Sequence, residues 1–259
     1  MNLKSLSKNG SLVLALLVVC GVALPAYADS LNLVVNGSFE DYVVSADSQC
    51  GPFANCVGFY NGSAGYDNIA GWQLIGKSGI YGDGNPIPGA PPTIMLLGYN
   101  YHEPVGETDG TLHFHPQHGL QSVDLTGEGN QGIGNGIKQS VATVPGKDYT
   151  LTFWLGHQFG FAPGYTEGPG ALEFYIDGQL MDSIANSENA FQDVAWTRYS
   201  HTFTANESET VIAFLNDTPV GNNYSGLDNV SLSAVPEPSS LVLLCAGIAS
   251  LAAFARKRD

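Results

Sequence analysis

The segment 149–155, YTLTFWL, constrains the fold most, because large apolar residues at every odd position alternate with Thr150, Thr152 and Trp154. Alternation with a period of two is the pattern of a β-strand that buries one face. Thr150, Thr152 and Trp154 should therefore point to one side of the strand, and the apolar residues between them to the other. Only one of these sides can face a core.

Further strand signals follow this segment. Asp177-Gly178 separates two apolar runs and is a strong hairpin signal, because a type I′ turn needs positive φ at both positions. No stretch of 12 residues has a convincing helical period. The other expected strands are 31–35, 121–125, 137–144, 171–176, 179–184, 197–204, 210–215 and 227–232. Roughly nine short strands predict an all-β fold, an antiparallel β-sandwich.

The first 28 residues have the three parts of a secretory signal peptide. Lys4 and Lys8 precede an apolar run over 12–24, and small residues at positions 26 and 28 form a cleavage site. We expect signal peptidase to cut between Ala28 and Asp29. The expected organisation is a signal peptide over 1–28, one domain over 29–234 and a sorting segment over 235–259.

The last 25 residues resemble the PEP-CTERM sorting signal of Gram-negative bacteria. An apolar run over 241–255 separates a Pro-Glu-Pro motif from a basic tail, and the matching residues are Pro236, Glu237, Pro238, Arg256, Lys257 and Arg258. The resemblance implies a transient hydrophobic helix in the inner membrane, handling by an exosortase, and delivery to the cell surface or extracellular matrix. The alternative is a plain C-terminal membrane anchor.

Composition narrows the partners of the domain. The chain has 24 acidic against 9 basic residues and a formal net charge of −15. A phosphate backbone requires Lys and Arg contacts, so nucleic acid is not an expected partner. Hydrophobic residues make up 44% of the chain, which excludes a charge-rich disordered protein. The surplus of acidic residues favours either the binding of divalent cations or simply the solubility of the domain.

Cys50 and Cys56 are the two cysteines of the domain. Their spacing in an oxidising compartment favours a disulfide that closes a small loop. They lie in the segment 42–120, which is rich in Gly and Pro and is expected to form long loops.

Six motifs occur in a fixed order along the domain. They are LVVNGSFE at 33–40, Gly71-Trp72, GLQSVDL at 119–125, IKQSV at 137–141, PGKDYTLTFW at 145–154 and GLDNVSL at 226–232. This order resembles the galactose-binding-like jelly rolls, including carbohydrate-binding modules of families 4 and 9 and DUF642 domains. The segment 42–120 departs from the pattern, so ligand specificity does not transfer.

The resemblance implies a structural calcium ion and a sugar-binding surface. The positions that match the calcium site are Glu40, Asp228 and the carbonyl of Ser38, and oxygen ligands suit calcium. The alternative is that these acids belong to a turn and a strand edge. Sugar rings stack on aromatic faces, for which Trp154 is the first candidate, followed by Trp72, Tyr99 and Tyr101. The alternative is that the tryptophans fill the core.

The sequence gives weaker support for a transition-metal site or for catalysis. His113, His115 and His118, with Asp109 close by, form either a transition-metal site or a polar loop. The chain has no Gly-x-Ser-x-Gly motif, and no pair of acids is singled out, so we expect no enzymatic activity. The expected function is polysaccharide binding by an exported surface or matrix protein. The alternatives are a structural matrix protein without sugar binding, or a hydrolase.

Overall fold

The computed structural model describes part of the chain. The described residues are 31–41, 49–50, 53–60, 69–76, 93–105, 110–127, 133–158, 168–188, 193–218 and 224–236, with Gly247 and Ser250. Contacts within the chain divide it into two units, Leu31–Ala234 and the two terminal segments Met1–Ser30 and Val235–Asp259. Gly247 and Ser250 have helical backbone, and the rest of the predicted sorting helix lies outside the described residues.

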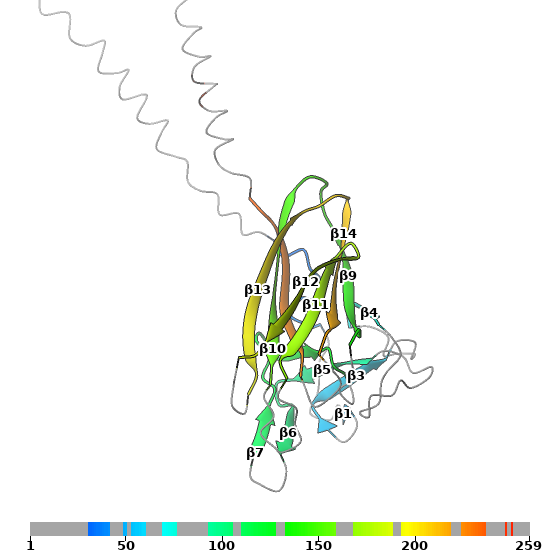
Figure 1. Ribbon diagram of the computed structural model, residues 1–259, viewed down its shortest axis with the longest axis vertical. Coiled ribbons are helices and arrows are strands. Elements are labelled where there is room, and N and C mark those ends of the chain that lie inside the picture. The colour runs from blue at the N-terminus through cyan, green and yellow to red at the C-terminus, as the bar shows by residue number, and fades with distance from the viewer. Residues whose placement is uncertain are drawn as a thin grey trace, which may run out of the picture. The chain divides into compact units, whose positions relative to one another are not determined.

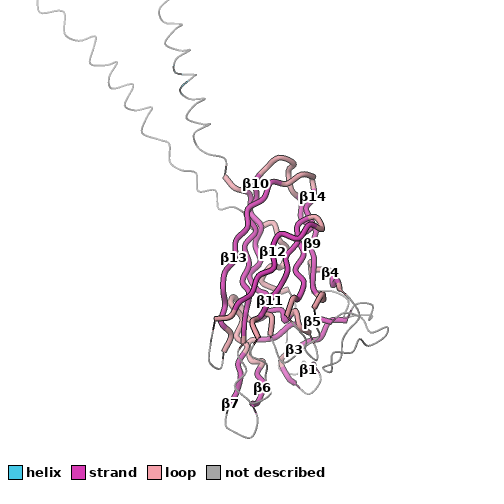
Figure 2. Tube along the Cα trace, in the orientation of Figure 1, coloured by secondary structure: helices cyan, strands magenta, loops and turns pink. Residues whose placement is uncertain are grey.

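Within Leu31–Ala234, two antiparallel sheets form a sandwich (Figures 1 and 2). The six-stranded sheet has the order β13 (Ala195–Thr204), β10 (Asp148–His157), β15 (Gly226–Ala234), β8 (Gln121–Asp124), β5 (Thr93–Gly98) and β3 (Cys56–Tyr60). The five-stranded sheet has the order β12 (Gln179–Asn186), β11 (Gly170–Ile176), β14 (Glu209–Asn216), β9 (Gly136–Ala142) and β4 (Gln73–Ile75). Two short antiparallel pairs complete the described strands, β1 (Gln49–Cys50) with β2 (Phe53–Ala54), and β6 (His102–Val105) with β7 (Gly110–His113).

The strand order is that of a jelly roll. From β8 onward the chain passes repeatedly between the sheets, which gives the orders β8-β15-β10-β13 and β9-β14-β11-β12. These eight strands form two interleaved Greek keys. The predicted fold class is therefore confirmed, and the expected strands from 121 onward are all present within a few residues. Asp177 and Gly178 both have positive φ, as the predicted hairpin turn requires.

The main core lies between the two sheets. It includes the large side chains of Trp72, Phe39, Phe153 and Phe214, all 2% exposed or less. Phe153 and Phe214 meet edge to face with their centroids 4.9 Å apart. Alternate residues of each strand supply this core, so the remaining residues of each strand form the outer faces of the sandwich.

A second apolar cluster covers the other side of the six-stranded sheet at its β3–β5 end. It joins Met95 and Leu97 of β5 to the β6–β7 region, with Tyr101, Leu112, Phe114, Tyr224 and Cys56. The long loop predicted over 42–120 is thus wrong in part, because β5 runs through it. Residues 94–97 of β5 do not alternate in polarity, since both of its faces are covered by apolar clusters.

The strand predicted over 31–35 is also wrong, because its backbone bonds largely to side-chain amides. Oδ1 of Asn32 accepts the N–H groups of Val34 and Leu232. The amide of Gln139 takes both the N–H and the carbonyl of Val35. The N–H of Leu33 makes one backbone bond, to the carbonyl of Leu232 in β15. The amides take the place of the other ladder bonds, so the segment attaches to the sandwich without forming a strand of either sheet.

Candidate functional site

Strand β10 turns Trp154 away from the core, as its alternation predicted. Residues 149, 151, 153 and 155 are buried, whereas 150, 152 and 154 are partly exposed. The indole of Trp154 therefore lies on the outer face of the six-stranded sheet. Its ring is half-buried, so part of it stays accessible.

Cross-strand neighbours extend this outer face over three strands. The register places Arg198 and Asp228 beside Trp154, Ser200 and Ser231 beside Thr152, and Thr202 and Ser233 beside Thr150. The hydroxyls of Thr150 and Thr202 lie 3.2 Å apart and form a hydrogen bond. Each hydroxyl can both donate and accept, so the face offers rows of hydrogen-bonding groups next to an indole. We call this surface of β13, β10 and β15 the hydroxyl face.

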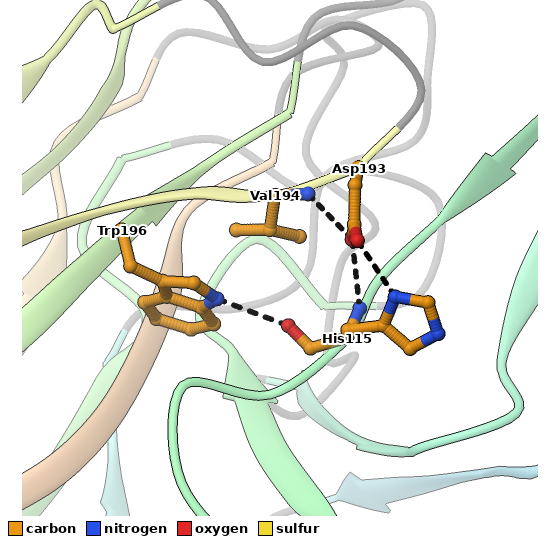
Figure 3. A network of polar contacts seen from close by, with 4 residues as sticks. All are labelled: His115, Asp193, Val194 and Trp196. Carbon is orange, nitrogen blue, oxygen red and sulfur yellow. Dashed lines mark hydrogen bonds and ion pairs between the residues drawn. The ribbon is translucent and has the colours of Figure 1, made fainter.

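Trp196 belongs to the same face and was missed by the sequence reasoning. It is half-buried in β13 and pairs with Gly156 of β10. A Cβ built on Gly156 would lie 2.8 Å from Cζ3 of Trp196, so the indole lies directly against the glycine. Its Nε1 donates to the carbonyl oxygen of His115 at 3.0 Å (Figure 3). Extending the predicted strand 197–204 backward by one residue would have placed Trp196 in phase with Arg198.

The other aromatic candidates are placed differently. Trp72 is 2% exposed in the main core, and Tyr101 is 3% exposed in the second cluster. Neither presents a ring face to solvent. The core-filling alternative therefore describes Trp72 better than sugar stacking does, and Tyr101 is buried in an apolar cluster in the same way. Tyr99 is 48% exposed and contacts the ring of His115, with centroids 4.6 Å apart.

Glu40 and Asp228 converge on one loop, residues 117–121. The N–H groups of Leu120 and Gln121 donate to Oε1 of Glu40 at 2.8 and 3.0 Å. The N–H of His118 donates to Oδ2 of Asp228 at 2.9 Å, although these residues are 110 positions apart. The predicted pair of carboxylates is therefore brought together, and half-buried Ser38 lies two residues before Glu40.

The environment of Asp228 is unfavourable for a charge. Its side chain is completely buried, and this burial raises the pKa of its carboxyl to about 7. Hydrogen bonds from the backbone of His118, Asn229 and Gln117 lower the pKa, while the carboxylate of Glu40 raises it. In the described part of the chain, Asp228 forms no salt bridge. A cation at this position would supply the missing charge.

A second polar cluster surrounds His115 (Figure 3). Nδ1 of His115 lies 2.7 Å from Oδ2 of Asp193. Oδ1 of Asp193 accepts the N–H of His115 at 3.2 Å and of Val194 at 2.8 Å. Among the described residues, no group of three or more His, Cys, Asp or Glu side chains could hold a metal ion.

Several predicted sites reach beyond the described residues. Cys56 is disulfide-bonded and completely buried. The side chain of Cys50 lies outside the described residues, so its pairing with Cys56 stays a prediction. The cleavage site at Ala28 and Asp29 and the sorting residues beyond Pro236 also lie outside them. In the described part of the chain, no helix has the length and apolar character to span a membrane.

Comparison with known proteins confirms the sorting segment. Residues 234–258 match the family model of the PEP-CTERM protein-sorting motif. This motif is a signal of exported proteins, so the chain is one that passes through a membrane on export.

One curated relative is similar over most of the domain. Halomucin of Haloquadratum walsbyi is 27% identical over 235 residues, which cover 88% of this chain. The chain spans only 2% of the length of halomucin.

The solved structures that are similar include three carbohydrate-binding modules. A family 61 module in complex with β-1,4-galactotriose is 13% identical, covers 80% of this chain and 100% of its own, and has a TM-score of 0.38. A family 4 module is 15% identical, with coverages of 78% and 99% and a TM-score of 0.33. The CBM22-1 xylan-binding domain of Paenibacillus barcinonensis Xyn10C is 13% identical, with coverages of 70% and 94% and a TM-score of 0.35. The jelly-roll assignment rests on the strand order given above.

Proposed function

We propose that this chain is an exported, non-catalytic protein that binds polysaccharide on the hydroxyl face. The observation that carries the proposal is the composition of this face. Two indoles, one guanidinium group and rows of hydroxyls share it, and no large aliphatic side chain interrupts the rows.

The chemistry of this face fits a sugar polymer. A pyranose ring presents one apolar face, which stacks on an aromatic ring, and hydroxyls at its edge, which need donors and acceptors. Trp154 supplies the ring, while Arg198, Thr152 and Ser200 supply hydrogen-bonding groups around it. The indole of Trp196 is held in place by its bond to His115 and by Gly156, so little side-chain entropy is lost when a ligand binds.

We also propose calcium as a structural ion at Glu40 and Asp228. The hard carboxylate oxygens suit calcium. Among the described residues, the N–H groups that donate to Glu40 bond its Oε1, which leaves Oε2 for an ion. An ion held by these residues would tie the N-terminal turn to β15 and to the loop 117–121.

Handling by an exosortase and delivery to the surface or extracellular matrix of a Gram-negative cell are the remaining part of the proposal. The matched tail supports it. Exported protein should then begin at Asp29 and lack Arg256–Arg258, which intact-mass measurement decides. Released protein that still carries the basic tail would contradict sorting.

The test of sugar binding is a glycan array probed with the exported protein in calcium-containing buffer. We expect retention on at least one polysaccharide class, without release of reducing sugar. Binding to no glycan would favour a structural matrix protein, and turnover of a bound glycan would make the protein a hydrolase. Either result would overturn the proposal.

A further inference from the structure

Two aromatic rings continue from the hydroxyl face beyond its end at Trp196. Trp196 and Trp154 are diagonal neighbours on β13 and β10, and such neighbours lie about 7–8 Å apart, within reach of aromatic side chains. The indole N–H of Trp196 donates to the carbonyl oxygen of His115 (Figure 3). The ring of His115 contacts the ring of Tyr99, with centroids 4.6 Å apart and planes tilted by 42°. These neighbours form a continuous line of four rings from Trp154 to Tyr99.

Tyr99 presents an exposed ring on a fixed backbone. It follows directly after β5, and nearly half of its surface is accessible. Its N–H donates to the carbonyl oxygen of Leu120 at 2.7 Å, and the N–H of Leu120 donates to Oε1 of Glu40 at 2.8 Å. Because the backbone of Tyr99 is already held, little entropy is lost when a ligand stacks on its ring.

His115 supplies a hydrogen-bond acceptor beside this ring. Its Nδ1 lies 2.7 Å from Oδ2 of Asp193, which accepts, so the neutral ring carries its proton on Nδ1 and its lone pair on Nε2. Oδ1 of Asp193 accepts the N–H groups of His115 and Val194, which fixes the carboxylate. Figure 3 shows Nε2 turned away from Asp193 and Trp196, and the side chain of His115 is 36% exposed.

An exposed aromatic ring with an acceptor at its edge is the arrangement that a pyranose requires. The apolar face of the sugar stacks on the ring, and a sugar hydroxyl donates to the acceptor. A purely structural tether between β13 and the segment at His115 would need the bonds of Asp193. It would not need an exposed Tyr99 ring or an Nε2 that points away from the tether.

We propose that Tyr99 and His115 form a second sugar subsite, which continues the hydroxyl face past Trp196. One pyranose ring stacks on Tyr99, and one of its hydroxyls donates to Nε2 of His115. A ligand that reaches from Trp154 to Tyr99 must extend over several sugar units, so the protein binds a polysaccharide along its chain. The formal net charge of −15 disfavours a polyanion, so the polymer is a neutral one. This inference rests on the proposed sugar binding by the hydroxyl face.

The test uses the exported protein with three neutral polymers, β-1,4-galactan, β-1,4-xylan and β-1,4-glucan, each compared with its own disaccharide. We expect the parent protein to bind at least one polymer more tightly than the matching disaccharide in affinity gels and calorimetry. Tyr99→Ala should lose roughly 5- to 150-fold in affinity for this polymer. Tyr99→Phe is the matched control and should bind like the parent protein, because it keeps the ring. Both variants should melt like the parent protein, since the ring is exposed.

Nitrogen NMR of the histidine rings tests the contact with His115 directly. In the free protein, Nε2 of His115 should give the resonance of an unprotonated nitrogen, and this resonance should shift when the polymer binds. Equal affinity of Tyr99→Ala and the parent protein for the polymer, or an Nε2 resonance that the polymer leaves unchanged, would overturn the second subsite alone. If no gel retains the parent protein, the binding of neutral polysaccharide by the hydroxyl face is itself wrong, and this inference falls with it.

Discussion

Trp72 and Trp154 are chemically identical and lie in opposite environments. Trp72 lies between the sheets, with Phe39 and Phe214 at centroid distances of 5.6 and 6.2 Å, and its Nε1 donates to the carbonyl of Asn36. Trp154 is half-buried on the hydroxyl face, with Arg198 and Asp228 beside it in register. The first indole can act only through stability, whereas the second has a surface that a ligand can reach.

The largest expected effect comes from the interior. Trp72→Ala should lower the free energy of unfolding by about 3–5 kcal/mol, because it leaves a cavity and removes the donor to Asn36. Denaturant unfolding of the exported protein measures this loss. If Trp72→Ala has the same free energy of unfolding as the parent protein, then Trp72 does not act through stability and the contrast with Trp154 is wrong.

Calcium should have the next largest effect. An ion at a hundredfold excess over its Kd adds about 2.7 kcal/mol of stability. For a domain of this size, removal by EDTA should lower the melting temperature by roughly 5–10 °C. Asp228→Asn should abolish this difference, because it removes a ligand charge from a buried position.

Asp182→Asn is the matched control for the calcium test, since it makes the same change at an exposed carboxylate of β12. It should keep the full response to EDTA. If protein first stripped of metal has the same melting temperature with and without calcium, then calcium does not stabilise the domain.

The sequence predicted Trp154 better than Trp72 for a physical reason. Seven alternating residues define a face for Trp154, whereas Trp72 precedes β4, which is only three residues long. β5 was not predicted, because both of its faces are buried and its sequence therefore does not alternate between apolar and polar residues.

The arrangement of the histidines at the β6–β7 hairpin could be predicted from the sequence only in part. His113 and His115 have the spacing of one strand face, but the pairing of His102 with His113 depends on a hairpin that no turn motif marked. Glu40 and Asp228 were found through a family resemblance, since no local pattern links residues at opposite ends of the domain. The raised pKa of Asp228 follows from burial, which composition does not reveal.

The central claim is that the hydroxyl face binds polysaccharide through Trp154. Tyr175 is the matched aromatic control, because it is half-buried on the outer face of the five-stranded sheet, between Leu180 and Ala213 in register. The direct measurement is retention of Trp154→Ala and Tyr175→Ala in affinity gels that contain the polysaccharide bound by the parent protein.

Loss of stacking at Trp154 should cost about 1–3 kcal/mol of binding, by analogy with base stacking on aromatic side chains. This is a loss of roughly 5- to 150-fold in affinity. Both variants should melt like the parent protein, and Tyr175→Ala should bind like it. Equal retention of Trp154→Ala and the parent protein, or loss of retention in Tyr175→Ala instead, would contradict the account.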